Sequence, residues 1–155
     1  MSTRRLGIGI IGTGNISSAY LKAILGRDGL PGFPVLDVRG LADMRHETAE
    51  ARAAEFGLSA MSLDDMLADP GIALIVNLTI PRAHVEVGLR CLAAGKHVYS
   101  EKPLGINFAE GKRLLDAAKA AGLRIGSAPD TFLGGAHQQA RAVVDSGVLG
   151  QLVGG

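Results

Sequence analysis

The sequence predicts an α/β fold in which helices cover both faces of a doubly wound, mostly parallel sheet. Short apolar runs rich in β-branched residues alternate with longer segments of helical spacing, which is typical of successive βαβ units. Three chemically distinct polar segments each follow one of the apolar runs directly. Because ligands of open parallel sheets bind outside the carboxyl ends of the strands, we expect these segments to meet in one site.

Five apolar segments are the expected strands of this sheet. The third is a continuous apolar run, as expected for a strand that is buried on both faces. The predicted strands span residues 6–11, 35–42, 72–78, 97–99 and 124–126. Near the end of the chain, Leu152 and Val153 could begin a further strand, which would have no partner in this chain.

Helical patterns fill the segments between and after these strands. Ser62 followed by Asp65, and Asn107 followed by Glu110, are capping signals for helix N-termini. A glycine stands just past the end of three of the helices, where it favours termination. The predicted helices span residues 16–25, 46–56, 62–69, 82–94, 107–121 and 136–146.

The composition argues against several classes of partner. With 16 basic and 15 acidic side chains the net charge is +1, and no basic stripe favours nucleic acid or a membrane surface. No apolar stretch approaches the roughly 20 residues of a membrane span, and the basic N-terminus lacks the apolar core of a signal peptide. The single cysteine, Cys91, excludes an internal disulfide framework and suits a reducing cytoplasm.

A glycine-rich segment follows the first predicted strand. Two overlapping frames, 7–12 and 12–17, resemble the G-x-G-x-x-G phosphate-binding pattern, and only the second both follows a strand and opens a helix. In that frame Gly12 permits the tight turn and Gly14 lets a pyrophosphate approach the backbone. The helix beginning near Asn15 directs free N–H groups at the phosphates. A serine replaces the third glycine, so helix and strand are expected to pack slightly further apart. A plain glycine-rich turn is the alternative.

Asp43 ends the second predicted strand. A carboxylate there can accept hydrogen bonds from both ribose hydroxyls of an adenosine, and it favours NAD because it would repel a 2′-phosphate. It lies further from the glycine segment than the usual roughly 20 residues because a Gly/Pro-rich loop at 26–34 intervenes. Arg45 could offset the negative charge for NADP. The alternative is that Asp43 caps the helix that begins at His46.

The remaining polar segments follow the third and fourth predicted strands. They are Asn77-Leu78-Thr79 with Pro81 and His84, and Glu101-Lys102-Pro103. Together with Gly-Ile-Ile-Gly-Thr-Gly-Asn-Ile at 9–16, Ala42-Asp43, and Ala-Ala-Gly-Lys-His-Val-Tyr-Ser-Glu-Lys-Pro-Leu at 93–104, they resemble the Gfo/Idh/MocA family of glucose–fructose and inositol-type oxidoreductases. The resemblance covers essentially the whole chain, and the 93–104 segment is its most specific part.

The resemblance implies a Rossmann domain that binds NAD, or NADP, with the Glu-Lys-Pro motif beside the nicotinamide. It implies a catalytic Lys102, whose ammonium group would stabilise the negative charge that develops on oxygen during hydride transfer and could relay a proton. A surface lysine before a helix-leading proline is the structural alternative, and Lys102–Pro103 is a candidate cis bond. His84 either faces the cofactor or stands at a helix start. The expected cofactor-binding residues are Gly12, Thr13, Gly14, Asn15, Ile16, Asp43, Arg45, Thr79, Pro81, His84, Glu101 and Lys102.

Other reactive side chains have simpler explanations. Cys91 is expected to pack as a small hydrophobic residue, and His97 to be structural. Asp130 and His137 follow the last strand and could face a substrate. Asp130 could equally be a turn residue after Pro129, whereas a plain helix residue is the favoured interpretation of His137. No spacing of His, Cys and Asp suggests a metal site.

We therefore expect the nucleotide-binding domain of an NAD(P)-dependent oxidoreductase that transfers hydride to or from a sugar, inositol or related polyol. Family enzymes carry a second α/β domain, so residues 1–150 are expected to form the NAD(P)-binding domain and 151–155 the start of a crossover into a substrate domain absent from this chain. A homo-oligomer in the full-length form and a cytoplasmic location are also expected. The alternatives are an NAD-dependent glycoside hydrolase of the same fold and a non-catalytic nucleotide-binding or interaction module.

Overall fold

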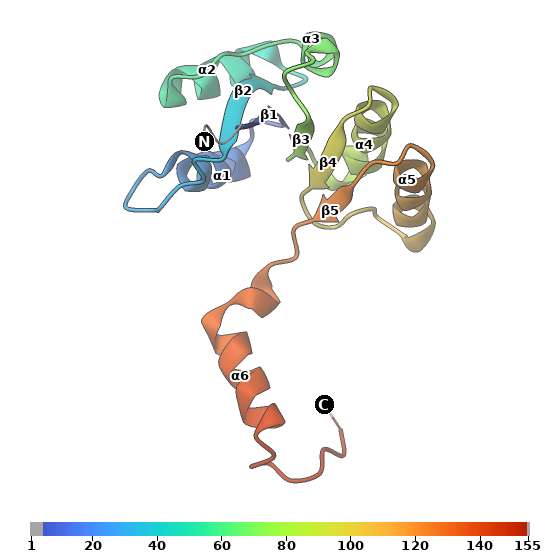
Figure 1. The fold of residues 1–155 in the computed structure, drawn as a ribbon. Helices are drawn as coiled ribbons and strands as arrows, with labels where there is room; N and C mark the ends of the chain where they lie inside the picture. The colour runs from blue at the N-terminus through green and yellow to red at the C-terminus, as the bar shows by residue number, and fades with distance from the viewer. Residues whose placement is uncertain (1–4, 155) are drawn as a thin grey trace.

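The computed structural model describes residues 5–154, in which five strands form one sheet in the order β2-β1-β3-β4-β5 (Figure 1). Every neighbouring pair of strands is parallel, which confirms the predicted α/β fold class. The strands are β1 (Leu6–Ile11), β2 (Leu36–Ala42), β3 (Leu74–Asn77), β4 (His97–Ser100) and β5 (Ile125–Ser127). The basic N-terminal residues 1–4 and the last residue of the expected crossover, Gly155, lie outside the described residues.

The carboxyl ends of four strands lie level. Ile11 at the end of β1 is paired with Ala42 at the end of β2 and with Asn77 at the end of β3. Asn77 is paired in turn with Ser100 at the end of β4. The loops that follow these strands therefore leave the sheet along one edge, here called the carboxyl edge, and the polar segments of the sequence are in these loops.

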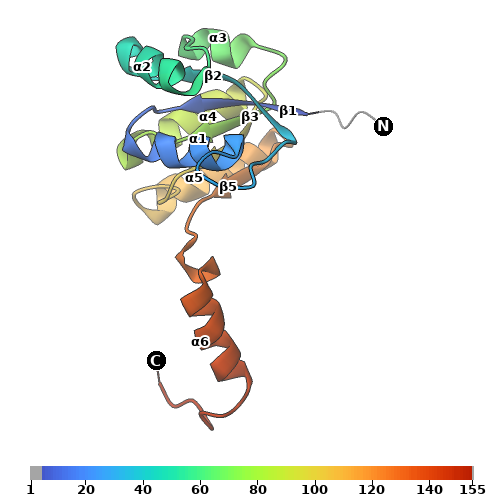
Figure 2. The same cartoon turned by 90° about the vertical axis from the view of Figure 1, so that its left-hand side faces the viewer.

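Helices cover both faces of the sheet (Figure 2). One face packs against α1 (Asn15–Leu25) and α2 (His46–Phe56), which contribute Leu21 and Phe56 to a cluster with Ile8 and Ile10. The other face packs against three helices through a cluster that includes Met66, Leu114 and the fully buried Cys91. Burial raises the pKa of the Cys91 thiol to about 12. These helices are α3 (Leu63–Ala68), α4 (His84–Ala93) and α5 (Phe108–Ala120).

Two glycines of the 7–12 frame are β1 residues whose identity is set by packing. A Cβ on Gly9 would lie 2.6 Å from the sulfur of Met66, and one on Gly7 would lie 1.8 Å from the carbonyl oxygen of Gly71. The close approach of neighbouring groups to β1 thus explains why glycines stand at these two positions, and no bound ligand is needed to account for them. The 12–17 frame is the one that leaves a strand and opens a helix, as the sequence predicts.

The third strand is shorter than the apolar run at 72–78. The side-chain oxygen of Asn77 accepts the N–H of Thr79 at 3.2 Å, and this turn ends β3 at Asn77. The helix predicted over 82–94 is preceded by a 3₁₀ turn, Pro81–Ala83, and begins at His84. The other predicted bounds differ by at most one residue, which is within the uncertainty of element ends. Among residues 150–154 no strand forms at Leu152 and Val153.

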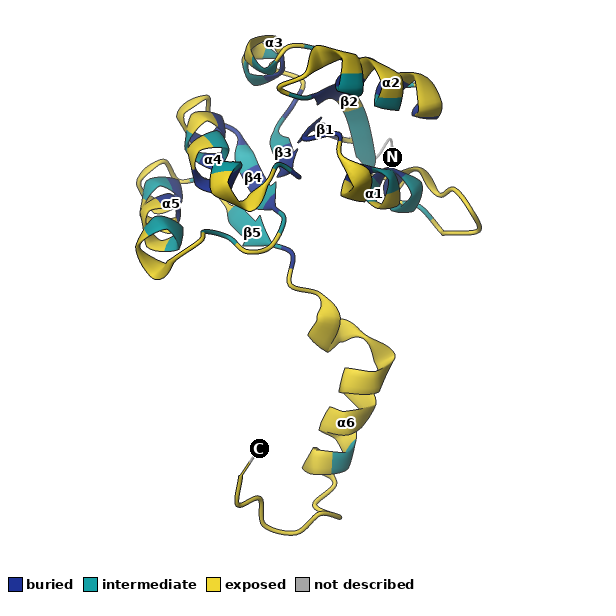
Figure 3. Ribbon diagram, turned by 180° about the vertical axis from the view of Figure 1, so that it is seen from behind, coloured by how far each residue is buried: buried dark blue, intermediate teal, exposed yellow. Residues whose placement is uncertain are grey.

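The last helix, α6 (Gly135–Asp145), stands away from the sheet (Figures 1 and 3). It follows a second 3₁₀ turn, Thr131–Leu133, and has no buried residue. His137 lies on this helix and is exposed.

Lys96 fixes the opposite, amino edge of the sheet. Its side chain is buried, and Nζ donates hydrogen bonds to the carbonyl oxygens of Asp69 at 2.6 Å and Ile72 at 2.9 Å. Both carbonyls belong to the loop before β3, whereas Lys96 directly precedes β4. One side chain therefore holds the starts of two neighbouring strands together.

Candidate functional site

Two hollows lie at the carboxyl edge, and the start of α1 is a wall of both. The first has a volume of about 360 Å³ and the second of about 600 Å³. Asn15 lines the first hollow and the next residue, Ile16, lines the second. The first is lined by Thr13, Gly14, Asn15, Asp43, Arg45, Thr48, Ala51, Arg52 and Glu55. The second is lined by Ile16, Ala19, Tyr20, Ala23, Leu78, Thr79, Pro81, Glu101, Lys102 and Asp130.

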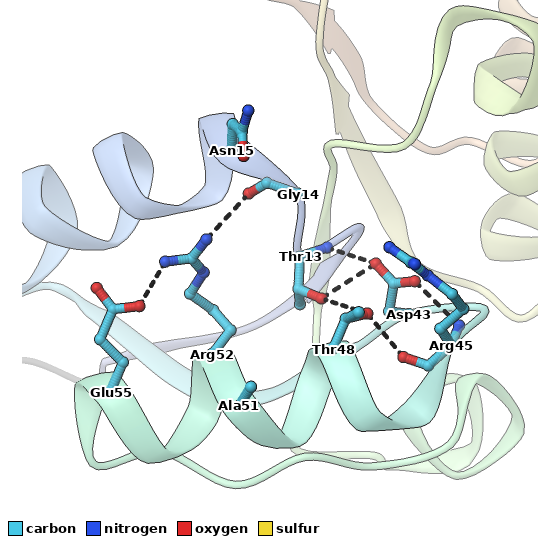
Figure 4. A pocket seen from close by; sticks show the side chains of 9 residues that line it. All are labelled: Thr13, Gly14, Asn15, Asp43, Arg45, Thr48, Ala51, Arg52 and Glu55. Atoms are coloured by element: carbon cyan, nitrogen blue, oxygen red, sulfur yellow. Dashed lines mark hydrogen bonds and ion pairs between the residues drawn. The ribbon is translucent and has the colours of Figure 1, made fainter.

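In the first hollow the Asp43 carboxylate lies between Thr13 and Arg45 (Figure 4). One oxygen accepts the backbone N–H of Thr13 at 2.8 Å and its hydroxyl at 3.0 Å. The other oxygen accepts the backbone N–H of Arg45 at 3.0 Å. The N-cap position of α2 is occupied by Arg45, although its side chain makes no capping hydrogen bond. The alternative role of Asp43 as the N-cap is therefore wrong. Asp43 instead ties the glycine loop after β1 to the end of β2.

The same hydrogen bonds set the charge of Asp43. Burial raises the pKa of its carboxyl, but the bonds from Thr13 and Arg45 outweigh burial and hold the pKa below its ordinary value. The group is therefore a carboxylate at neutral pH, and its oxygens can only accept hydrogen bonds. This suits the hydroxyl groups of a sugar.

The glycine loop leaves open space at the start of α1. Gly12 has a φ of 94°, and a Cβ there would lie 2.6 Å from the backbone carbon of Leu78. A Cβ on Gly14 would meet nothing within 4 Å, so the space above that residue is open. The α1 N-terminus has no side-chain cap, and the buried Ser17 hydroxyl donates to the Gly14 carbonyl at 2.6 Å. Uncapped N–H groups facing open space fit the pyrophosphate of a dinucleotide.

In the second hollow, Glu101 links α1 to the loop after β4. One carboxylate oxygen accepts the hydroxyl of Tyr20, on α1, at 2.8 Å, and the other accepts the backbone N–H of Lys102 at 2.8 Å. Burial and the Glu101 carboxylate both raise the pKa of Tyr20, so its phenol stays protonated and donates. The Lys102 side chain is exposed, and the Lys102–Pro103 bond is cis, as the sequence analysis proposed.

His84 lies beneath the second hollow and does not line it. It is the first residue of α4 and is 1% exposed. Its Nδ1 lies 2.7 Å from the carbonyl oxygen of Pro103, and its Nε2 lies 2.8 Å from that of Thr79. The ring therefore supports the loops after β3 and β4 from behind.

Several lining residues were missed by the sequence analysis. Thr48 and Arg52 stand four residues apart on the side of α2 that faces the glycine loop, and the Arg52 guanidinium lies 3.5 Å from the Gly14 carbonyl. Tyr20 lies one helical turn after Ile16, and this spacing was the available signal. Asp130, which the sequence left open between a turn and the substrate side, lines the second hollow, whereas His137 lines neither. In residues 5–154 no group of three His, Cys, Asp or Glu side chains could hold a metal ion.

Comparison with known proteins identifies the family. Residues 6–128 match the NAD-binding Rossmann fold of the Gfo/Idh/MocA oxidoreductase family. The chain belongs to the Gfo/Idh/MocA family. Residues 6–128 are therefore the NAD-binding Rossmann domain of this oxidoreductase family. None of the helices within residues 5–154 is long and apolar enough to cross a membrane.

Individual Gfo/Idh/MocA relatives are similar over nearly all of this chain. Inositol 2-dehydrogenase of Gluconacetobacter diazotrophicus is 29% identical over 96% of the chain. A dTDP-3,4-didehydro-2,6-dideoxy-α-D-glucose 3-reductase of Streptomyces violaceoruber is 32% identical over 97%. The crystal structure of a 3-ketoreductase from Actinomadura kijaniata, in complex with NADP and TDP-benzene, is 27% identical over 93% with a TM-score of 0.80. The chain spans only 44%, 43% and 43% of these three proteins.

Proposed function

We propose that the chain provides the cofactor half of an oxidoreductase that transfers hydride to or from a sugar, inositol or related polyol. One observation carries this proposal: the uncapped start of α1 separates a hollow containing Asp43 from a hollow containing Lys102. A dinucleotide has the matching order of parts, with a pyrophosphate between two nucleosides. When bound, NAD(P) supplies the hydride acceptor or donor.

The first hollow would hold the adenosine end. Asp43 Oδ1 accepts a single hydrogen bond, from Arg45, and so keeps a lone pair for a ribose hydroxyl, which favours NAD. Arg45 stands at the rim and would offer a positive charge to a 2′-phosphate, so NADP fits less well but is not repelled outright. Gly14, Asn15 and Ile16 would hold the pyrophosphate through backbone N–H groups. The N–H groups of Gly12 and Thr13 already donate to the Ala42 carbonyl and to Asp43, so these two residues would shape the loop around the phosphates.

The second hollow would hold the nicotinamide end. Thr79 and Pro81 line it from the loop after β3, and Lys102 lines it from the loop after β4. The Lys102 ammonium group would stabilise negative charge on the substrate oxygen and hold or move its proton. Glu101 would fix the backbone of Lys102, whose N–H it accepts at 2.8 Å.

The substrate class comes from the relatives. They are named for an inositol and for dideoxy sugar nucleotides, which share neighbouring hydroxyl or keto groups on a ring. Because this chain spans less than half of their length, we propose that a further domain of the full-length protein makes most substrate contacts. We also propose that the full-length protein is a cytoplasmic homo-oligomer.

NADH titration of the chain, followed by fluorescence, tests this proposal. Saturable binding below millimolar concentration is expected, and Lys102→Ala in the full-length enzyme should lower kcat by about 10²–10⁴. Lys112→Ala is the matched control, because Lys112 is exposed on α5 and pairs with Asp116. Absence of NADH binding at millimolar concentration would overturn the proposal. Wild-type turnover by Lys102→Ala would favour a non-catalytic module, and cofactor that is never released in reduced form would favour a hydrolase.

A further inference from the structure

The two hollows at the carboxyl edge differ in the charge of their walls. Two carboxylates, Asp43 and Glu55, and two guanidinium groups line the first hollow, so its charges balance. Two carboxylates, Glu101 and Asp130, line the second hollow, but only one positive group, the ammonium of Lys102, does so. The other residues within 5–154 that line it are uncharged. The second hollow therefore has one negative charge in excess.

Asp130 supplies the carboxylate that no neighbour engages. The Glu101 oxygens accept the Tyr20 hydroxyl and the backbone N–H of Lys102. By contrast, no ion pair within residues 5–154 includes Asp130, and its exposed side chain does not cap the 3₁₀ turn that follows it. Its charge nevertheless acts across the hollow, because burial and Glu101 raise the pKa of Tyr20 most and Asp130 raises it further. Asp130 is thus available to act on a ligand.

The backbone on either side of Asp130 is fixed although its side chain is free. Before it, the N–H of Ala128 donates to the carbonyl oxygen of Ser100 at 3.1 Å, which continues the pairing of β5 with β4. After it, the carbonyl oxygen of Asp130 accepts the N–H of Leu133 at 2.8 Å. Because Ser100 ends β4, the loop after β5 is anchored at the start of the loop that carries Lys102.

We propose that Asp130 makes the second hollow favour the oxidised cofactor over the reduced one. The nicotinamide ring of NAD⁺ carries a positive charge, whereas that of NADH is neutral. A free carboxylate attracts the charged ring far more than the neutral ring, and the ammonium group of Lys102 acts with the opposite sign. The adenosine and the pyrophosphate are the same in both forms, so their contacts cancel when the two affinities are compared. This inference rests on the proposed function, which puts the nicotinamide end in the second hollow.

The same preference favours reduction of the substrate over its oxidation. In that direction a keto carbon of the substrate gains the hydride, its oxygen gains a proton through Lys102, and the nicotinamide ring gains its positive charge. A carboxylate that stabilises the charged ring therefore shifts the equilibrium between the bound pairs towards the alcohol and NAD⁺.

Calorimetric titration of the chain with NAD⁺ and with NADH tests the charge effect. The measured quantity is the ratio of the Kd for NAD⁺ to the Kd for NADH. Asp130→Asn removes the charge and keeps the size of the side chain, and we expect it to raise this ratio about three- to tenfold. Lys102→Met removes the opposite charge and should lower the ratio. Asp116→Asn is the matched control, because Asp116 lies on α5 and pairs with Lys112, and it should leave the ratio unchanged.

Salt gives a second check on the same variant. The screening length in water falls from about 10 Å at 0.1 M salt to about 3 Å at 1 M. Because the Asp130 side chain is exposed, the difference in ratio between wild type and Asp130→Asn should shrink over this range. A change in ratio that came from an altered shape of the hollow would not depend on salt in this way.

The outcomes separate this inference from the proposed function. If Asp130→Asn changes the NAD⁺ and NADH affinities equally, or changes neither, the charge effect of Asp130 is overturned while the proposed function stands. Ratios that move in the same direction in Asp130→Asn and Lys102→Met would also overturn it. A wild-type chain that binds neither form would overturn the proposed function and this inference with it. If Asp130→Asn does not fold, Asp130→Ser is the second variant for the same ratio.

Discussion

At the residue scale, the acidic side chains of the carboxyl edge hold backbone groups of neighbouring loops. Asp43 accepts the N–H of Thr13, and Glu101 accepts the N–H of Lys102. Each carboxylate thus fixes a loop and still presents a negative charge beside a hollow. Replacing either residue is therefore expected to change the shape of a loop as well as a direct contact.

The stabilising effect of Asp43 should depend on pH. Because its pKa is lowered in the folded chain from an ordinary value of 3.8, its contribution is fully present above that value and is lost as the pH falls through the lowered pKa. The difference in urea midpoint between wild type and Asp43→Asn should be greatest near neutral pH and should disappear at strongly acidic pH. A difference that stays constant down to strongly acidic pH would contradict this prediction.

Arg45 should influence which dinucleotide binds best. Its side chain is exposed at the rim of the first hollow and forms no ion pair among the described residues. Arg45→Ala should weaken NADPH binding about tenfold, because a charge-assisted bond to the 2′-phosphate is lost. NADH binding should change less than about twofold. Paired titrations with both cofactors check this, and equal losses for the two would refute it.

At the element scale, α1 and the loop after β4 are joined through one hydroxyl. The sequence pattern predicted both elements and put their polar residues at strand ends, because apolar periodicity and glycine stops are local signals. It did not predict that Tyr20 meets Glu101, 81 residues away, nor that His84 is buried. Those contacts arise only when helices pack on the sheet, and no local propensity encodes them.

Removing the Tyr20 hydroxyl should loosen this junction. Tyr20→Phe is expected to cost about 1 kcal/mol of stability, the net value of a typical hydrogen bond, and to weaken NADH binding at the second hollow. Tyr99→Phe is the control, since the Tyr99 side chain is partly buried in the same core cluster. Urea unfolding and NADH titration of both variants measure the effect, and equal behaviour of the two would count against the junction.

Lys96 should matter for stability alone. Lys96→Met leaves the carbonyl groups of Asp69 and Ile72 without their charged donor, which we expect to cost about 2–4 kcal/mol of unfolding free energy. NADH affinity of the folded variant should remain unchanged, because Lys96 lies at the amino edge. Denaturant unfolding and titration together test this, and a large loss of affinity at native stability would show that the prediction is wrong.

At the scale of the whole molecule, the two hollows act as one site only if a single ligand spans them. A dinucleotide at about 100 times its Kd should stabilise the chain by about 2.7 kcal/mol, which raises Tm by roughly 5–10 °C for a chain of this size. At the same concentration, AMP or nicotinamide mononucleotide alone should raise Tm less, since each fills one hollow and therefore binds more weakly. Thermal unfolding with each ligand checks this, and an equal shift with AMP and NADH would mean that the second hollow contributes nothing.

The level ends of the strands have a consequence for engineering. Because the loops that line both hollows leave one edge of the sheet and Lys96 secures the other, the two edges can be altered independently. Changes at the amino edge could raise heat tolerance without altering cofactor choice, and changes in the first hollow could alter cofactor choice without unfolding the scaffold. A variant library divided along this line would keep selection for ligand preference separate from selection for robustness.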